Sequence, residues 1–243
     1  MGTMKVPSLP IAEGIVPIPR VIHQVWVGGQ PPYWVRQLWL RWDAFGVKND
    51  FEVRRWTDNN TEHTISWRVA QEHNLTAVQM ADFLRIEILA LQGGLYMDSD
   101  TMPLRDLSSW VGLRPGWLAH GQSWLNSGEP TVSNAMIGMP KGTAFMSELF
   151  EHAVKALDRG VKNTFDIAGP KAYRRLLTDD MGIEVAHEDA FPAFREKQKR
   201  AERSLGRPMT VDELKVMYPA ARVAHLSAES WVEGKIERRA LDV

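Results

Sequence analysis

Two aspartates near the middle of the chain are the residues best suited to chemistry. They stand in the stretch GGLYMDSD, residues 93–100, where Asp98 and Asp100 are one residue apart. Two carboxylates held close together repel each other unless a cation neutralises them or one of them binds a proton. Carboxylate oxygens favour a hard cation such as Mg²⁺ or Mn²⁺, especially one shared with a phosphate. The triplet alone leaves open a second interpretation, a turn in which both acids cap backbone amides.

The elements before this acid pair place it at the end of a strand. Residues 77–92 carry apolar side chains at helical spacing, and Gly93 ends the predicted helix. Residues 94–97 then read as a short strand, with the acids directly after it. In open α/β sheets, ligands bind beyond the carboxyl ends of the strands. The pattern therefore predicts a binding site where the acids begin.

Asp82 and Arg85 interrupt the same apolar helix. They are three residues apart, so both lie on one face of the helix. A surface ion pair is the ordinary explanation for such a pair. Because the helix is apolar nearly all round, we expect this polar pair to point toward a specific site.

The rest of the chain alternates strands and helices. A strand at 20–29, a helix beginning after the prolines at 31–32, and a strand at 51–58 predict a parallel βαβ start. Loop-rich short strands are expected after Asp100. Further expected elements are helices at 143–157 and 169–178, a charged helical pair at 194–218 and a strand opening 221–231.

The length indicates one generous domain, residues 1–243, or a domain with a small appendage. The chain is 44% hydrophobic and has a formal net charge of −1, so no global field attracts it to nucleic acid or to a membrane surface. It has no cysteine, which excludes disulfides and thiolate chemistry and suits a reducing cytoplasm. The N-terminal residues lack the apolar segment of a signal peptide.

Two segments resemble a known family. The stretch ADFLRIEILALQGGLYMDSDTMPL, residues 81–104, resembles the sugar-binding region containing the DXD motif of glycosyltransferase family 32. That family includes initiating α-mannosyltransferases of yeast, and the glucosylating clostridial toxins are more distant relatives. The opening IPRVIHQVWVGG, residues 18–29, resembles the first strand of the same family. The resemblance covers about residues 17–231, but 194–222 read as a helical insertion of unknown role.

The resemblance implies a GT-A-like fold: a Rossmann-like mixed sheet flanked by helices, with a helical C-terminal segment. It implies that Asp100 binds a divalent metal ion, Mn²⁺ or Mg²⁺, and that Asp98 holds the donor ribose and supports the metal. Asp82 and Arg85 match the pair that binds the hydroxyls of the transferred sugar. Trp26 matches the aromatic residue that stacks on the nucleotide base, with a core tryptophan as the alternative.

The C-terminal part supplies further candidates. The segment AHLSAESW, residues 224–231, is similar to the family's segment with the third metal ligand, which would be His225. Ser230 and Trp231 would then lie beside the donor phosphates. Asn134 resembles the asparagine that faces the sugar or the acceptor. A purely structural role for His225 stays open.

The resemblance also implies a mechanism and a donor. The family retains the anomeric configuration, and no extra carboxylate is well placed as a nucleophile, although Glu87 is on the helix of Asp82. We therefore expect a same-face displacement, with a UDP-sugar as the favoured donor and GDP-mannose as the other option.

The acceptor is not specified by the sequence. A glycan, a lipid-linked glycan, a protein, a small molecule and a hydroxylated base in DNA all stay open for a cytoplasmic bacterial or phage enzyme. The basic cluster at 195–207 reads either as a solvated helix face or as a binding surface for phosphates. The two competing functions are a metal-dependent hydrolase or nuclease and a non-catalytic nucleotide-sugar binder.

Overall fold

The architecture was determined from a computed structural model that describes residues 8–14, 16–121, 131–187, 189–191, 202, 204–205 and 209–226. Ser230, Trp231 and most of the basic cluster at 195–207 lie outside the described residues, so the structure does not test the predictions for them.

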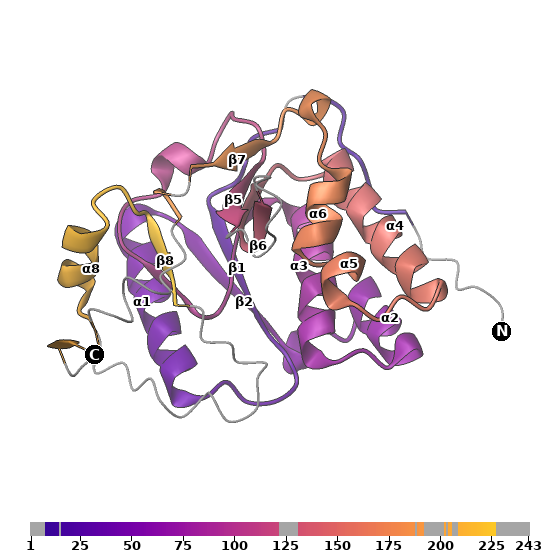
Figure 1. Cartoon of the computed structure of the whole chain (residues 1–243), viewed down its shortest axis with the longest axis horizontal. Helices are drawn as coiled ribbons and strands as arrows, with labels where there is room; N and C mark the ends of the chain where they lie inside the picture. Colours follow the sequence, from indigo (N-terminus) through magenta and orange to yellow (C-terminus); the bar gives the residue numbers. More distant parts are fainter. Residues whose placement is uncertain are drawn as a thin grey trace.

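A mixed sheet forms the centre of the described chain (Figure 1). Its order is β2-β1-β3-β6-β5-β7, and β1 lies parallel to both β2 and β3. Strand β6 runs antiparallel to β3 and β5, and β7 is parallel to β5. The strands are β1 (Val21–Trp26), β2 (Glu52–Thr57), β3 (Gly94–Met97), β5 (Trp117–Gly121), β6 (Thr131–Met139) and β7 (Glu184–Ala186). The predicted parallel start and the predicted mixed sheet are both confirmed.

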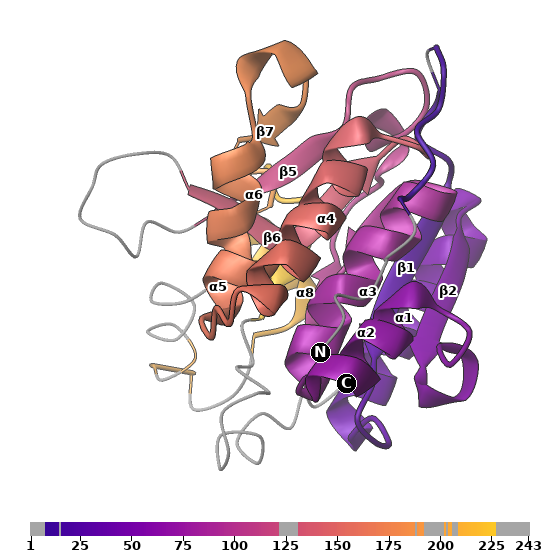
Figure 2. The same ribbon diagram turned by 90° about the vertical axis from the view of Figure 1, so that its right-hand side faces the viewer.

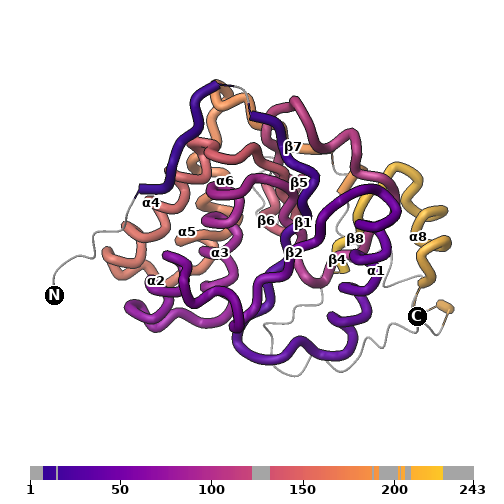
Figure 3. Tube along the Cα trace, turned by 180° about the vertical axis from the view of Figure 1, so that it is seen from behind, coloured from indigo at the N-terminus to yellow at the C-terminus, as the bar shows by residue number. Residues whose placement is uncertain are grey.

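A second, two-stranded sheet joins distant parts of the chain. Strand β4 (Thr101–Pro103) follows the acid pair and is antiparallel to β8 (Val223–His225). In this register Thr101 lies opposite His225. The tube in Figure 3 shows the two strands side by side near α1 (Tyr33–Asn49).

Helices cover both faces of the central sheet. Helices α1 and α8 lie on one side, and α2 to α6 lie on the other, as Figures 1 and 2 show. Their bounds are α2 (Ile65–His73), α3 (Ala77–Gln92), α4 (Ala144–Asp158), α5 (Thr164–Ile167), α6 (Pro170–Leu176) and α8 (Val211–Met217), with short 3₁₀ turns η1 (Asp58–Asn60), η2 (Ser108–Trp110) and η3 (Asp179–Met181). The helix predicted at 77–92 coincides with α3. None of the described helices is long and apolar enough to cross a membrane.

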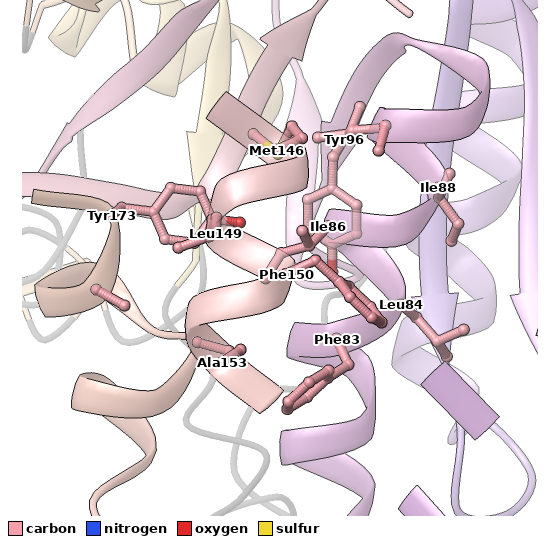
Figure 4. Packing of buried hydrophobic residues seen from close by; sticks show 14 of the residues in the cluster. Phe83, Leu84, Ile86, Ile88, Tyr96, Met146, Leu149, Phe150, Ala153 and Tyr173 are labelled. Atoms are coloured by element: carbon pink, nitrogen blue, oxygen red, sulfur yellow. The ribbon is translucent and has the colours of Figure 1, made fainter. Parts of the chain in front are cut away.

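The main core lies between the sheet and the layer of α3 and α4. Phe83 of α3 and Phe150 of α4 meet edge to face at a centroid separation of 5.6 Å (Figure 4). Tyr96 reaches the same cluster from β3. Because aromatic rings of this size bury much apolar surface, this packing holds α3 firmly against β3.

The turn from α3 into β3 depends on its two glycines. Gly93 has φ +66° and Gly94 has φ +107°, conformations that a residue with a side chain rarely adopts. A Cβ added at Gly94 would lie 2.6 Å from the Val21 carbonyl oxygen and 3.2 Å from His23 Nε2. The glycines therefore let β3 pass close to β1, which fixes where the acid pair emerges.

His23 secures the same junction from β1. Its ring is buried, Nε2 donates to the Gly93 carbonyl at 2.9 Å, and Trp56 Nε1 donates to Nδ1 at 3.2 Å. Burial lowers the pKa of His23 to about 4, although the Gly93 carbonyl acts in the opposite direction. His23 is therefore a neutral packing residue at pH 7.

Candidate active site

The acid pair occupies a tightly hydrogen-bonded turn between β3 and β4. The Asp98 amide donates to the Ala135 carbonyl at 2.8 Å, and the Thr101 amide donates to the Asp98 carbonyl at 3.0 Å. Between the two acids, the buried Ser99 hydroxyl donates to the Val25 carbonyl at 2.9 Å. These bonds use the Asp98 and Thr101 amides and the Ser99 hydroxyl, and the Asp98 carboxylate takes no part in them.

The pairing of β4 with β8 brings His225 to the acid pair. His225 Nε2 lies 3.2 Å from Asp100 Oδ1. One ligand atom from each of Asp98, Asp100 and His225 lies within 4.8 Å of the other two. Two carboxylate oxygens and one imidazole nitrogen at this separation form a donor set that fits a divalent cation.

Arg85 links the acid pair to Asp82. Its Nη2 atom lies 3.1 Å from Asp82 Oδ1 and 3.2 Å from Asp98 Oδ1. Its Nη1 atom donates to the Asn134 carbonyl, and the Asn134 amide donates to Asp82 Oδ1 at 3.1 Å. The structure thus brings Asp82, Arg85, Asp98 and Asn134 into one network.

Tyr96 is a member of this network that the sequence analysis missed. Its hydroxyl donates to Asp98 Oδ1 at 2.9 Å, and the Arg85 guanidinium lies 4.5 Å from the centre of its ring. Side chains two residues apart on a strand share a face, so the spacing from Asp98 was a usable signal.

Burial raises the pKa values of both carboxylates that contact Arg85. The pKa of Asp82 rises to about 7 because its carboxyl is desolvated, while Arg85 opposes the rise, Asp98 adds to it and the Asn134 hydrogen bond opposes it. Desolvation also raises the pKa of Asp98, again against the effect of Arg85. Burial therefore disfavours the ionised form of both carboxyl groups, and a bound cation would favour it.

Trp26 ends β1 at the same edge of the sheet. Its half-buried ring meets Trp34 edge to face at a centroid separation of 6.3 Å. Strand β1 is parallel to β3, and the acid pair follows β3. Trp26, at the carboxyl end of β1, therefore lies at the same edge of the sheet as the acid pair. This is the edge where parallel sheets bind ligands.

Glu87 faces away from this network and holds α2. Its Oε1 accepts from the Ile65 amide at 2.9 Å, and its Oε2 accepts from the Ser66 amide at 2.7 Å and the Ser66 hydroxyl at 2.6 Å. Three bonds to one buried carboxylate satisfy the first turn of α2. Glu87 is a structural residue in this geometry.

Helix α6 contributes a buried hydroxyl beside the network. Gly169 and Pro170 begin the helix, with Pro170 in its first turn, which is a structural use of both residues. Tyr173 is fully buried, and its hydroxyl has no hydrogen-bond partner among the described residues. Its raised pKa reflects burial first, with Arg85 acting in the opposite direction.

Comparison with known proteins points to one family. Residues 41–123 match the family described as glycosyltransferase sugar-binding region containing DXD motif. In this segment the chain resembles that family. The matched region contains Asp82, Arg85, Asp98 and Asp100, whereas Asn134 and His225 lie beyond it.

Two curated proteins are similar to this chain. The chain is 32% identical over 171 residues to Uncharacterized glycosyltransferase L373 of Acanthamoeba polyphaga mimivirus, an alignment covering 67% of this chain and 65% of that protein. It is 28% identical over 139 residues to Inositol phosphoceramide mannosyltransferase 3 of Schizosaccharomyces pombe, covering 54% of this chain and 36% of that protein. The chain thus spans less than two thirds of the length of each.

A solved structure supports the fold of this chain. PaToxG Glycosyltransferase superposes with a TM-score of 0.55 at 17% identity, covering 85% of this chain and 86% of that one. At this identity the likeness shows the fold alone, and it confirms the predicted GT-A type.

Proposed function

We propose that this chain is a metal-dependent, retaining glycosyltransferase that moves a sugar from a nucleotide-sugar donor to a hydroxyl acceptor. One observation carries the proposal. The possible ligand atoms of Asp98, Asp100 and His225 lie within 4.8 Å of one another, directly beside the Arg85 network. That arrangement suits a donor diphosphate bound next to its own sugar.

Asp98, Asp100 and His225 would hold Mn²⁺ or Mg²⁺. A cation bound there supplies charge stabilisation for the diphosphate leaving group. Ser230 and Trp231 follow β8 closely in the sequence and are proposed for the phosphate side of the donor. Trp26 is proposed to stack on the base from the end of β1.

The neighbouring network would bind the transferred sugar. Ionised Asp82 accepts hydrogen bonds from sugar hydroxyls, and Arg85 donates them. Asn134 orients Asp82 through its side chain and Arg85 through its carbonyl oxygen. Each of these groups is already held in place before a ligand arrives, which lowers the entropy cost of binding.

Retention is proposed from the family resemblance, and the described site offers no suitable nucleophile for reaching it by double displacement. A double-displacement mechanism needs a carboxylate that can attack the anomeric carbon. Glu87 is occupied by α2, and Asp82 and Asp98 are held by Arg85. We propose that the acceptor oxygen bonds to the anomeric carbon on the face that the phosphate leaves. The acceptor proton passes to the departing phosphate oxygen.

We favour a UDP-sugar as donor and keep GDP-mannose as the alternative, because one relative is named a mannosyltransferase. The name of that relative also includes a phosphoceramide, which supports keeping a lipid-linked acceptor. A glycan, a protein and a hydroxylated DNA base complete the candidate acceptors.

The proposal is tested without an acceptor, because transfer to water also releases the nucleoside diphosphate. The chain is incubated with UDP-glucose, UDP-galactose, UDP-N-acetylglucosamine and GDP-mannose, each with Mn²⁺, and released UDP or GDP is measured. We expect release from one donor that is lost in EDTA and in Asp100→Asn. Binding of a donor without any release would favour the non-catalytic binder, and failure of every donor both to bind and to react would favour the hydrolase. Metal-dependent cleavage of nucleic acid would favour the nuclease.

A further inference from the structure

We propose that Asp58 is a positioning residue for the nucleotide-binding wall formed by Trp26 and the loop that follows it. The inference rests on the proposed function and deepens it. Asp58 opens η1, directly after the strand that pairs with β1.

The Asp58 carboxylate binds two successive backbone amides of the loop after Trp26. The Gly28 amide lies 3.0 Å from Oδ1 and 3.1 Å from Oδ2, and the Gly29 amide lies 2.8 Å from Oδ2. Consecutive amides that converge on one anion form a concave anion site. Here the protein supplies that anion itself, so these amides are not available to the donor phosphates.

The two glycines are required for this geometry. Gly28 has φ +87° and Gly29 has φ +123°, and both values strain a residue with a side chain. A Cβ at Gly28 would lie 2.5 Å from Ala77 Cβ in the first turn of α3. The loop is therefore held between Asp58 on one side and the start of the helix that carries Asp82 and Arg85 on the other.

The carboxylate of Asp58 is not needed to form its own turn. Thr57 and Asn60 make a reciprocal capping box around η1, and the Asn60 side chain also donates to the Arg55 carbonyl at 2.9 Å. Among the described residues, no cationic side chain lies within ion-pair distance of Asp58. The contact between this exposed acid and the loop is thus its main interaction in the described chain.

The register of the sheet connects Asp58 to Trp26. Trp26 is paired with Thr57, the residue before Asp58, so one strand end fixes both the ring that would stack on the base and the loop behind it. Loss of the carboxylate frees the loop but leaves the acid pair untouched. Donor affinity is expected to fall while the chemical step is preserved.

The test compares the wild-type chain with Asp58→Asn, which keeps one acceptor oxygen, and Asp58→Ala, which keeps none. Asp212→Asn is the matched control, because Asp212 is an exposed acid on α8 whose one ion pair among the described residues is with Lys215, at 3.6 Å. Binding of UDP and of GDP, each with Mn²⁺, is measured by calorimetry. Hydrogen exchange of the peptide containing residues 27–32 reports the loop, and kcat and KM come from the donor that the wild-type chain hydrolyses.

We expect the nucleotide Kd to rise about three-fold in Asp58→Asn and about tenfold in Asp58→Ala, with a parallel rise in KM. The kcat and the melting temperature should stay near wild type, and exchange in 27–32 should accelerate. An unchanged Kd in Asp58→Ala, or a joint fall of kcat and melting temperature, would overturn the positioning role. If the wild-type chain binds neither nucleotide, the proposed function fails and this role fails with it.

Discussion

His225 Nε2 lies 3.2 Å from Asp100 Oδ1, although the two residues come from opposite halves of the chain. The contact exists because β8 is antiparallel to β4 and places His225 opposite Thr101. The acid pair alone offers only carboxylate oxygens. With β8 in place, the same position also offers an imidazole nitrogen, and the three residues form one possible metal site.

The approach of β3 to β1 predicts a severe effect of Gly94→Ala. The new Cβ would meet the Val21 carbonyl oxygen at 2.6 Å on a backbone with φ +107°. We expect a loss of about 3 kcal/mol or more in the free energy of unfolding, measured by urea denaturation. Gly160→Ala is the control, since Gly160 has φ +75° but nothing within 4 Å of an added Cβ, and it should cost only about 1 kcal/mol. Equal losses in the two variants would contradict the close approach.

The buried neutral His23 predicts a pH dependence of stability. Its pKa is about 4 in the folded chain, against 6.5 for an unperturbed histidine, because burial disfavours the charged ring. Between these values the unfolded chain binds a proton that the folded chain does not, so stability falls as the pH is lowered. From pH 7 to pH 5 this group should cost about 2 kcal/mol.

His23→Gln removes the titrating ring and keeps a side chain that can donate and accept. The difference in unfolding free energy between pH 7 and pH 5 should shrink by about 2 kcal/mol in this variant. A variant with the same pH dependence as the wild-type chain would show that His23 is not the responsible group.

The raised pKa of Asp82 predicts that activity falls on the acid side of the pH profile, which we call the acid limb. Asp82 must be ionised to accept hydrogen bonds from the sugar hydroxyls with both of its oxygens, and burial raises its pKa to about 7 in the free protein. The value of kcat/KM, which reports the free enzyme, should therefore fall as the pH drops below about 7. Asn134→Ala removes a hydrogen bond that favours the ionised form, so the limb should move to higher pH.

A pH series of donor hydrolysis from both chains measures this shift. Asn59→Ala, an exposed substitution in η1, should leave the limb in place. Movement of the limb to lower pH in Asn134→Ala would show that Asn134 does not stabilise the Asp82 carboxylate.

The contacts of Glu87 predict a loss of stability without a loss of chemistry. Glu87→Gln removes the charge that accepts from the Ile65 and Ser66 amides, and it should cost about 1–2 kcal/mol of unfolding free energy. The kcat should stay within about three-fold of wild type, because Glu87 does not face the reacting groups. Glu148→Gln on the exposed side of α4 controls for the charge change. A sugar trapped covalently on Glu87 would refute the same-face displacement.

Much of the first half of the fold was predictable because its signals are local. Helix α3 begins at a capping box of Thr76 and Gln79 and ends at Gly93, and its apolar spacing lies between these two signals. The strand after it is short, apolar and followed at once by acids. The same local patterns identified Asp82, Arg85, Asp98 and Asp100, which the structure places together.

What the sequence did not reveal depends on contacts between distant segments. The pairing of β4 with β8 and the antiparallel position of β6 between β3 and β5 have no local signature. The contact of Asp58 with Gly28 and Gly29 likewise depends on two strand ends meeting in space. Tyr96 was missed for another reason, since a tyrosine in an apolar strand is read as core until its hydroxyl is seen on Asp98.

The central claim is that Asp98, Asp100 and His225 hold one divalent cation for a nucleotide-sugar donor. The most direct test is a Mn²⁺ titration followed by electron paramagnetic resonance, in the presence of whichever of UDP and GDP binds the wild-type chain. His225→Ala and Asp100→Asn are compared with His152→Ala, which alters a ring lying outside the site, with its Nε2 atom 3.1 Å from the Asp166 carbonyl oxygen. We predict one bound Mn²⁺ per chain, an affinity at least about tenfold weaker in His225→Ala and Asp100→Asn, and no change in His152→Ala. If both single variants, His225→Ala and Asp100→Asn, bound Mn²⁺ with wild-type affinity, the result would contradict the metal site and the mechanism built on it.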